Sequence, residues 1–193
     1  SETVEKFIPP RKGRRHVLRV IREILYFEPG KRGTNLNAAL EFLVRVTPHR
    51  SIAVILSDFL GQTFPTRAEI NAHLRRKVIL SEVLAQTSLI ALRQANRRHD
   101  VVAVQIIDRY ELELPALGRL VLKDAETGEV IEVNTGDERK RRVFAERQAK
   151  SQTELLRLFR SARIDSIQLR TDEPYAAALG RFFEVREKRR RHG

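Results

Sequence analysis

The strongest constraint on the fold is a continuous apolar run that ends in a carboxylate. The segment Ser51–Leu60, SIAVILSDFL, has only apolar residues from Ile52 to Leu56, and Ser57 and Asp58 follow. Its length and β-branched content predict a strand that is buried on both faces, as in a parallel sheet. A carboxylate at the carboxyl end of such a strand lies where open α/β sheets bind their ligands. The run therefore predicts an α/β fold with a candidate site at Asp58.

Strand and helix patterns alternate along the rest of the chain. Further strands are predicted at Val4–Ile8, Val101–Ile107 and Ile164–Leu169. Apolar residues at helical spacing predict helices at Arg14–Phe27, Asn35–Val46, Asp137–Arg163 and from about Pro174. The alternating segments Arg119–Lys123 and Val130–Asn134 predict a β-hairpin. Together these patterns predict a mainly parallel sheet with flanking helices and a β-hairpin insertion.

The chain is strongly basic, with a formal net charge of +12. Such a charge favours acidic partners, namely nucleic acid, anionic lipid or an acidic protein surface. The basic segments Arg11–Arg15, Arg139–Arg142 and Lys188–Arg191 offer phosphate contacts, although charge runs are more often solvated helix faces. Only 3 Tyr and no Trp are present to stack on bases. Binding to nucleic acid or to an acidic surface therefore remains the alternative function.

The residues that are missing also limit the possibilities. There is no Cys, which excludes disulfides and thiolate metal sites and fits a cytoplasmic location. The sequence shows no apolar run that is long enough to span a bilayer, and it shows no signal peptide. There is no Met either, which predicts that the sequence is a fragment or a processed product.

A hydroxyl group precedes the central strand on a tight loop. Gly33-Thr34 opens the helical segment before that strand. A Thr and an Asp on neighbouring loops at one sheet edge can jointly face a hard cation such as Mg²⁺, which prefers oxygen ligands. From the residues alone, capping a helix is the more common use of Thr34 and Asp58. Both interpretations stay open for these two residues.

Two further residues belong to the same hypothesis as a possible second shell. Ser57 could hydrogen-bond a metal-bound water, or it could be a satisfied hydroxyl at the strand end. Asp108 ends the neighbouring strand and could lie near the same crevice, although pairing with Arg109 is the interpretation that we favour. The 5 His residues lack the spacing of a zinc protease, and the sequence shows no Ser-His-Asp elbow. These observations favour a non-enzymatic protein.

Several segments in a fixed order resemble one bacterial family. They are KFIPPRKGRRHVLRVIREIL, GTNLNAALEFL, SIAVILSDFL, RRHDVVAVQIID with ELELP, LKDAETGE and RTDEPYAAALGRFF. The chain resembles von Willebrand factor A-like proteins of a domain-of-unknown-function (DUF) family that is often encoded beside MoxR-type AAA+ ATPases. The resemblance covers nearly all of residues 1–193 as a single partial domain. The resemblance does not extend to about Gln62–Ile90, which we expect to be a helical insertion. Residues 188–193 are expected to form a basic tail.

The resemblance implies a Rossmann-like sheet that carries a metal-ion-dependent adhesion site. In such domains three loops supply the metal ligands, and Thr34 matches the second loop and Asp58 the third. The Asp-x-Ser-x-Ser motif of the first loop does not occur in these residues. The chain is thus expected to start at the third strand of the domain. We expect the remaining sheet to have an open edge through which the chain could self-associate.

The function implied by the resemblance is cation-bridged docking. A Mg²⁺ ion held by part of its ligand shell would leave one position for an Asp or Glu of a partner protein. The implied partner is a MoxR-type AAA+ ATPase, with which the chain would act as a non-enzymatic adaptor in protein assembly or maturation.

Overall fold

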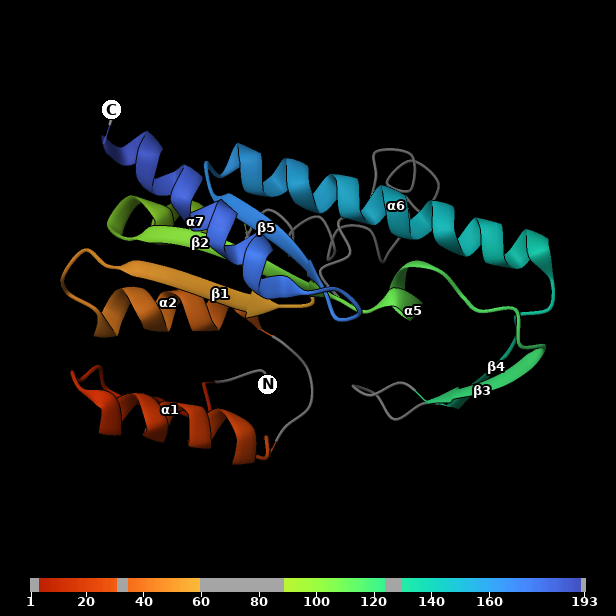
Figure 1. Ribbon diagram of the computed structural model, residues 1–193, viewed down its shortest axis with the longest axis horizontal. Coiled ribbons are helices and arrows are strands. Elements are labelled where there is room, and N and C mark those ends of the chain that lie inside the picture. Colours follow the sequence, from red (N-terminus) through yellow and green to blue (C-terminus); the bar gives the residue numbers. More distant parts are fainter. Residues whose placement is uncertain (1–3, 31–34, 60–88, 124–129, 192–193) are drawn as a thin grey trace, which may run out of the picture.

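The structure of the chain is a computed structural model that describes residues 4–30, 35–59, 89–123 and 130–191 (Figure 1). Thr34 lies outside the described residues, and so do residues 62–88 of the expected insertion. The described residues form a mixed α/β fold, as the sequence predicts, with one parallel sheet and helices on both of its faces. No helix in the described ranges has the length and apolar character needed to cross a membrane.

Within the described residues, the sheet has three parallel strands in the order β1-β2-β5. These strands are β1 (Ile52–Ser57), β2 (Asp100–Ile107) and β5 (Asp165–Arg170). Their register places Val54 beside Val102 and Val104 beside Ile167. Because the strands are parallel, their carboxyl ends all lie at one edge of the sheet.

The prediction that β1 is buried on both faces is wrong. Its side chains alternate between exposed and half-buried, and Ile52, Val54 and Leu56 are 55%, 46% and 67% exposed. The strand that is buried on both faces is β2, where four consecutive residues are almost completely inaccessible: Val101, Val102, Ala103 and Val104. The difference arises because the helix on that face of the sheet packs on β2 and β5 and leaves β1 open.

Helices cover one face of the sheet, and the larger of the two hydrophobic cores lies between these helices and the sheet. This layer contains α2 (Leu36–Val46), the helical residues 89–98 and α6 (Glu138–Ser161). Phe159 of α6 is buried against Phe59, with the two ring centroids 5.1 Å apart in an edge-to-face arrangement. Such a pair adds directional packing to the burial of apolar area.

One helix, α7 (Tyr175–Arg191), covers the opposite face. Leu179 and Phe182 pack on Val102, Val104 and Leu169 of the sheet. The covered residues belong to β2 and β5, and this leaves the same face of β1 open. The predicted basic tail is helical as far as Arg191, because its residues continue α7.

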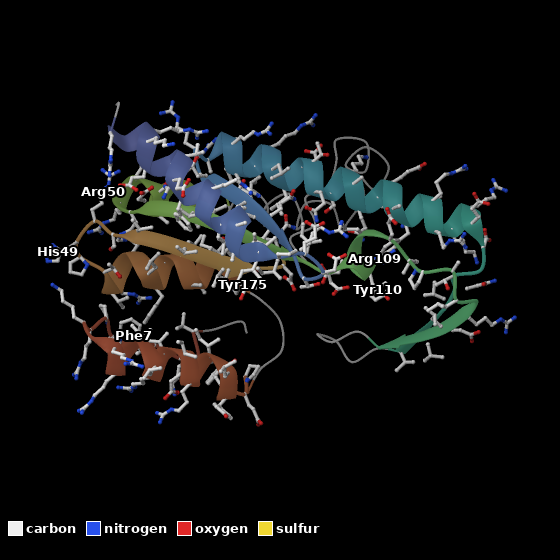
Figure 2. All side chains as sticks on the ribbon, in the orientation of Figure 1. Phe7, His49, Arg50, Arg109, Tyr110 and Tyr175 are labelled. Atoms are coloured by element: carbon white, nitrogen blue, oxygen red, sulfur yellow. The ribbon has the colours of Figure 1, made fainter. Side chains whose placement is uncertain are left out.

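The N-terminal region lies outside the main core. Helix α1 (Arg14–Tyr26) forms as predicted, but none of its residues is buried. The preceding segment is held by Lys6, which pairs with Glu23 at 2.8 Å, and by Phe7, whose ring meets Phe42 edge to face (Figure 2). The expected strand Val4–Ile8 is irregular, which corrects the prediction, because no described strand lies beside it to complete its hydrogen bonds.

The predicted hairpin forms with the expected boundaries. A short helix, α5 (Arg109–Leu112), follows β2 and leads to β3 (Arg119–Lys123), which pairs antiparallel with β4 (Val130–Asn134). In Figure 1 the hairpin stands beyond α5, apart from the three-stranded sheet.

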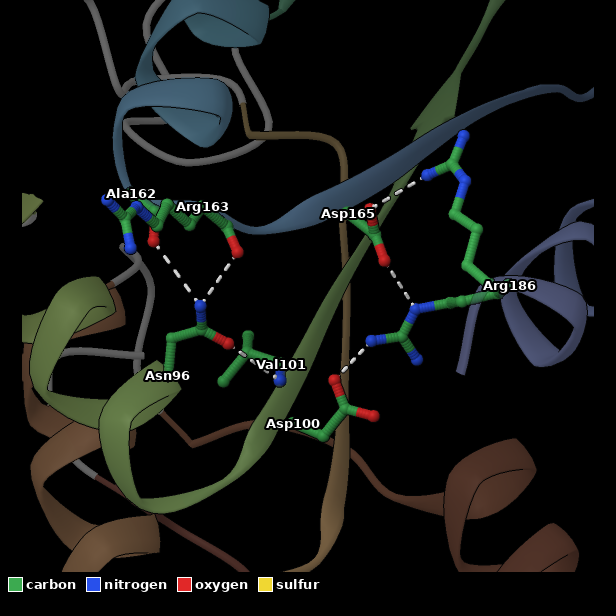
Figure 3. Close-up of polar contacts among 8 residues, drawn as sticks. Asn96, Asp100, Val101, Ala162, Arg163, Asp165 and Arg186 are labelled. Atoms are coloured by element: carbon green, nitrogen blue, oxygen red, sulfur yellow. Dashed lines mark hydrogen bonds and ion pairs between the residues drawn. The ribbon is translucent and has the colours of Figure 1, made fainter. Parts of the chain in front are cut away.

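Two polar side chains join separate elements near the amino ends of β2 and β5 (Figure 3). Arg186 of α7 hydrogen-bonds to Asp100 and, at 2.6 Å, to Asp165. The amide of Asn96 donates to the carbonyl of Arg163 at 2.8 Å and accepts from the N–H of Val101 at 3.1 Å. The charge-assisted hydrogen bonds of Arg186 fix α7 on its face of the sheet.

We predict that Arg186→Leu lowers the free energy of unfolding by about 1–3 kcal/mol, because it leaves the two carboxylates without their shared donor. The side chain of Arg186 is 11% exposed. The control is Arg189→Leu, since the side chain of Arg189 also contacts Asp165, at 3.8 Å, but is 72% exposed. This control should cost less than about 1 kcal/mol. Urea denaturation measures both changes, and equal losses would contradict the prediction.

We also predict that Val54→Lys suppresses self-association. An apolar edge strand can pair with another chain, and a charged side chain on the exposed face of that strand disfavours such pairing. Sedimentation velocity should show the average mass of the wild-type chain rising with concentration, and the variant should remain monomeric. Val121→Lys is the matched control, because Val121 is exposed on the hairpin, away from β1. A wild-type chain that stays monomeric at every concentration would refute this.

Candidate functional site

The candidate site lies at the carboxyl ends of β1 and β2. Asp58 follows β1 directly and is exposed. Asp108 follows β2, and Glu111 lies on the short helix α5 that begins there. We call these three residues the carboxyl edge.

The backbone around Asp58 is fixed from both sides. The hydroxyl of Ser57 accepts a hydrogen bond from the N–H of Phe59 at 3.0 Å and lies 3.4 Å from Oδ1 of Asp58, to which it donates. Phe59 has a φ of 55°, in the left-handed region. This conformation costs a non-glycine residue roughly 1–2 kcal/mol, and the burial of the Phe59 ring offsets that cost. The aromatic ring therefore enters the core while the Asp58 side chain stays at the surface.

A chain of glutamine side chains also reaches this loop. Gln105, buried on β2, donates to the carbonyl of Asp58 at 3.2 Å. Gln168 of β5 donates to Gln105 at 2.9 Å and to Gln152 of α6 at 2.7 Å. These bonds link the loop of Asp58 to β2, β5 and α6, and they satisfy the buried amide oxygen of Gln105.

Asp108 caps a helix in the structure. Its Oδ1 accepts from the N–H of Tyr110 at 2.9 Å, and Oε2 of Glu111 accepts from the N–H of Asp108 at 3.1 Å. This reciprocal arrangement is a capping box. The second carboxylate oxygen of Asp108 accepts from the hydroxyl of Thr171 at 3.0 Å. The expected pairing with Arg109 is thus replaced by the cap of α5.

The charges of the carboxyl edge act on one another. Burial raises the pKa of Glu111 above its ordinary value, and the negative charges of Asp58 and Asp108 raise it further. The hydrogen bond from the N–H of Asp108 acts in the opposite direction. The structure therefore brings Asp58 and Asp108 to one region, the arrangement expected from their positions after neighbouring strands.

The end of β5 differs in charge from the ends of its neighbours. Arg170 holds Asp172 in two hydrogen bonds of 2.8 and 3.0 Å. The hydrogen bond from Arg170 lowers the pKa of Asp172. Arg170 also contacts Glu173 at 3.0 Å. The acidic character of this sheet edge therefore comes chiefly from the residues that follow β1 and β2.

A Mg²⁺ site is only partly supplied by these residues. Asp58 and Ser57 offer oxygen donors of the kind that this ion prefers. No group of three Asp, Glu, His or Cys residues within the described ranges is placed to hold a metal ion. Thr34, the other predicted ligand, is outside those ranges. The described donors therefore fit the ion in chemical type but not in number.

Sequence reasoning missed Glu111, Gln105 and Thr171. A signal for Glu111 was present, because Asp108 and Glu111 have the spacing of a capping box. Gln105 gave no such signal within an apolar strand, and the contact of Thr171 with Asp108 requires knowledge of the strand order.

We predict that Asp58→Asn lowers the pKa of Glu111, because the variant removes a like charge that opposes ionisation of Glu111. The raised pKa also means that the folded chain binds this proton more tightly than the unfolded chain. Ionisation of Glu111 should therefore lower the stability as pH rises through its titration range. Carbon-13 NMR titration of the carboxyl groups measures the pKa, and Asp172→Asn is the control. An unchanged pKa of Glu111 in Asp58→Asn would contradict the arrangement.

Comparison with known proteins identifies relatives across the chain. The model of the family described as "Protein of unknown function DUF58" matches residues 1–78 and 68–154. Uncharacterized proteins of Mycobacterium bovis and Mycobacterium tuberculosis are 32% identical over 184 residues, which cover 94% of this chain and 50% of each relative. The chain thus spans about half the length of those relatives. An uncharacterized protein of Mycobacterium avium is 33% identical, with 94% of both chains covered.

No solved structure matches the chain at a significant level. The family match covers more than half of the chain, and the relative from Mycobacterium avium supports the match over nearly its full length. The chain therefore belongs to the DUF58 family.

Proposed function

We propose that the chain is a non-enzymatic protein-interaction module of the von Willebrand factor A type. In this proposal it is an adaptor for a MoxR-type AAA+ ATPase in the assembly or maturation of other proteins. The observation that carries the proposal is the position of Asp58, exposed at the carboxyl end of β1 beside the carboxylates that follow β2. This is the sheet edge at which open α/β folds bind ligands.

Exposed aromatic side chains support a protein partner at this end of the sheet. Figure 2 shows Tyr110 and Tyr175 toward the carboxyl end of the sheet, whereas His49 and Arg50 lie at the opposite end. Tyr110 is 60% exposed and Tyr175 is 64% exposed. Tyrosine is enriched at binding hot spots because it buries a large apolar ring and keeps a polar hydroxyl group.

The open side of β1 supports the part of the proposal that assigns the chain to a von Willebrand factor A-type sheet with further strands. The strands that a complete domain of this type would add are proposed to pair with β1, whose Ile52, Val54 and Leu56 are exposed on the face that α7 leaves open. Its backbone has no described neighbour on that side, since the sheet order is β1-β2-β5. Edge strands of this kind are favourable sites for strand pairing.

The proposal gives Mg²⁺ a limited part. Asp58 and Thr34 would contribute oxygen ligands, and a carboxylate of the partner would add another. Because the described residues supply too few metal ligands, we propose that the partner docks mainly through contacts with the protein surface rather than through the ion. Alone, the chain should bind Mg²⁺ weakly or not at all.

The test measures binding of the chain to a purified MoxR-type AAA+ ATPase by biolayer interferometry. We predict that Asp58→Asn weakens binding by at least about tenfold, equivalent to about 1.4 kcal/mol. Asp172→Asn is the matched control, because it removes a carboxylate from the same sheet edge that is already paired with Arg170. Calorimetric titration with Mg²⁺ alone should give no strong binding to either variant or to the wild-type chain.

Equal binding by the wild-type chain and Asp58→Asn would contradict docking at the carboxyl edge. The variants are more informative than a chelator, because a AAA+ ATPase itself uses Mg²⁺ with its nucleotide. Tight stoichiometric binding of Mg²⁺ by the chain alone that is lost in Asp58→Asn would contradict the expectation that the chain alone binds this ion weakly or not at all.

One observation favours the alternative of an acidic-surface or nucleic-acid binder. A cleft of about 550 Å³ is lined by Arg93, Arg97 and Arg163, where the helical residues 89–98 meet the end of α6. Arg93 is partly engaged, because it donates to the carbonyl of Ser161 at 3.2 Å. Binding to phosphates at this cleft would weaken steeply with salt and would be unaffected by Asp58→Asn.

A further inference from the structure

A second surface with the character of a binding groove lies between the hairpin and α6. The groove has a volume of about 490 Å³, within the usual range of ligand pockets. Its walls come from the segment after α5, from β4 and from the first half of α6. We call this surface the hairpin groove; its apolar lining residues are Leu114, Val133, Val143 and Phe144.

The hairpin is fixed to α6 by a compact set of hydrogen bonds. Thr135, which is completely buried, accepts from the N–H of Leu117 at 3.2 Å and donates to the carbonyl of Gly118 at 2.9 Å. Arg141 of α6 donates to the carbonyls of Thr135 and Gly136 at 2.7 and 3.0 Å. These bonds tie the two ends of the hairpin to each other and to α6, so the groove is preformed.

Two glycines lie where the hairpin meets this set of bonds. Gly118 has a φ of 79°, a conformation that L-residues rarely adopt. A Cβ on Gly136 would lie 3.1 Å from Oδ1 of Asn134, an oxygen that accepts from the N–H of Gly136 at 3.0 Å. The backbone therefore favours glycine at Gly118, and a side chain at Gly136 would have to displace Asn134.

The floor of the groove is apolar and accessible. Val143 is exposed on α6, and Phe144, Leu114 and Val133 are half-buried around it. Aliphatic and aromatic groups in a concave surface favour burial against an apolar partner.

The rim of the groove is basic. Arg139, Lys140 and Arg147 are exposed along the same part of α6 and line the groove. The carboxylate of Asp137 also lines it, but it is engaged in capping α6, with Oδ1 2.9 Å from the N–H of Arg139 and 3.3 Å from that of Lys140. The groove therefore offers side-chain cations around an apolar floor, which complements a ligand that is both acidic and apolar.

We propose that the hairpin groove binds an acidic amphipathic segment of a partner protein. Apolar side chains of that segment occupy the floor at Val143 and Phe144, and its carboxylates pair with Arg139 and Arg147. A nucleic acid is a poorer match, because Phe144 is half-buried rather than exposed for stacking on bases. The groove does not include Asp58, so this inference goes beyond the proposed function and does not rest on it.

The test uses a fluorescein-labelled synthetic peptide with leucine at every third or fourth position and glutamate elsewhere. Fluorescence anisotropy should show saturable binding to the wild-type chain. A peptide with the same leucines and lysine in place of glutamate should not bind. The variants Arg147→Glu and Val143→Ser should each weaken binding of the acidic peptide by about tenfold or more.

Matched variants separate the groove from general effects of charge and surface. Arg142→Glu makes the same charge change on α6, at a residue that contacts Glu146 at 3.8 Å and does not line the groove. Val121→Ser makes the same apolar change on the hairpin, at an exposed valine outside the groove. Both control variants should bind the acidic peptide as the wild-type chain does. Arg139→Glu provides a second charge reversal within the groove, and thermal unfolding verifies that every variant is folded.

Several results would overturn the inference. Equal binding of the acidic and basic peptides, or no binding of either, would exclude charge recognition by the groove. Equal losses in Arg142→Glu and Arg147→Glu would indicate a general effect of net charge. Binding of an oligothymidylate that is lost in Arg147→Glu would assign the surface to nucleic acid. Occupation of the groove by a second copy of the chain would appear in sedimentation as an association that Val143→Ser abolishes.

Discussion

Burial of β2 between two layers of helices is the constraint on which the rest of the structure depends. Its residues alternate between the core under α2 and α6 and the core under α7, and its backbone pairs with both β1 and β5. This strand therefore sets the register of its neighbours and the position of every loop at their carboxyl ends. Asp58 and Asp108 lie in one region because β1 and β2 run parallel and in register.

The sequence predicts most helices and strands correctly because their apolar residues repeat with a clear period. It fails where an element depends on its neighbours. The apolar run of β1 indicates a strand, but it does not show that α7 covers only β2 and β5. Val4–Ile8 has the composition of a strand and remains irregular, because a strand needs a partner for its backbone hydrogen bonds.

The candidate site is predictable to a similar extent. The end of an apolar run locates Asp58 and Asp108, and the parallel topology brings them together. The hydrogen bonds that hold them come from residues distant in sequence, such as Thr171 for Asp108 and Gln105 for the loop of Asp58. No local pattern encodes these contacts, since they arise from strand order and packing. The predicted ligand Thr34 lies outside the described residues, and its role therefore stays a prediction.

Helix α6 contacts both surfaces of interest. Its first half forms a wall of the hairpin groove, and its second half carries Gln152 and Phe159, which reach the loop of Asp58 through Gln168, Gln105 and Phe59. If a ligand at one of these surfaces shifted the helix, the same contacts would be the ones to move at the other surface. Thermodynamic linkage makes such an effect reciprocal, so each ligand would alter the affinity for the other by the same factor. The helix is thus the one described element that contributes contacts to both surfaces.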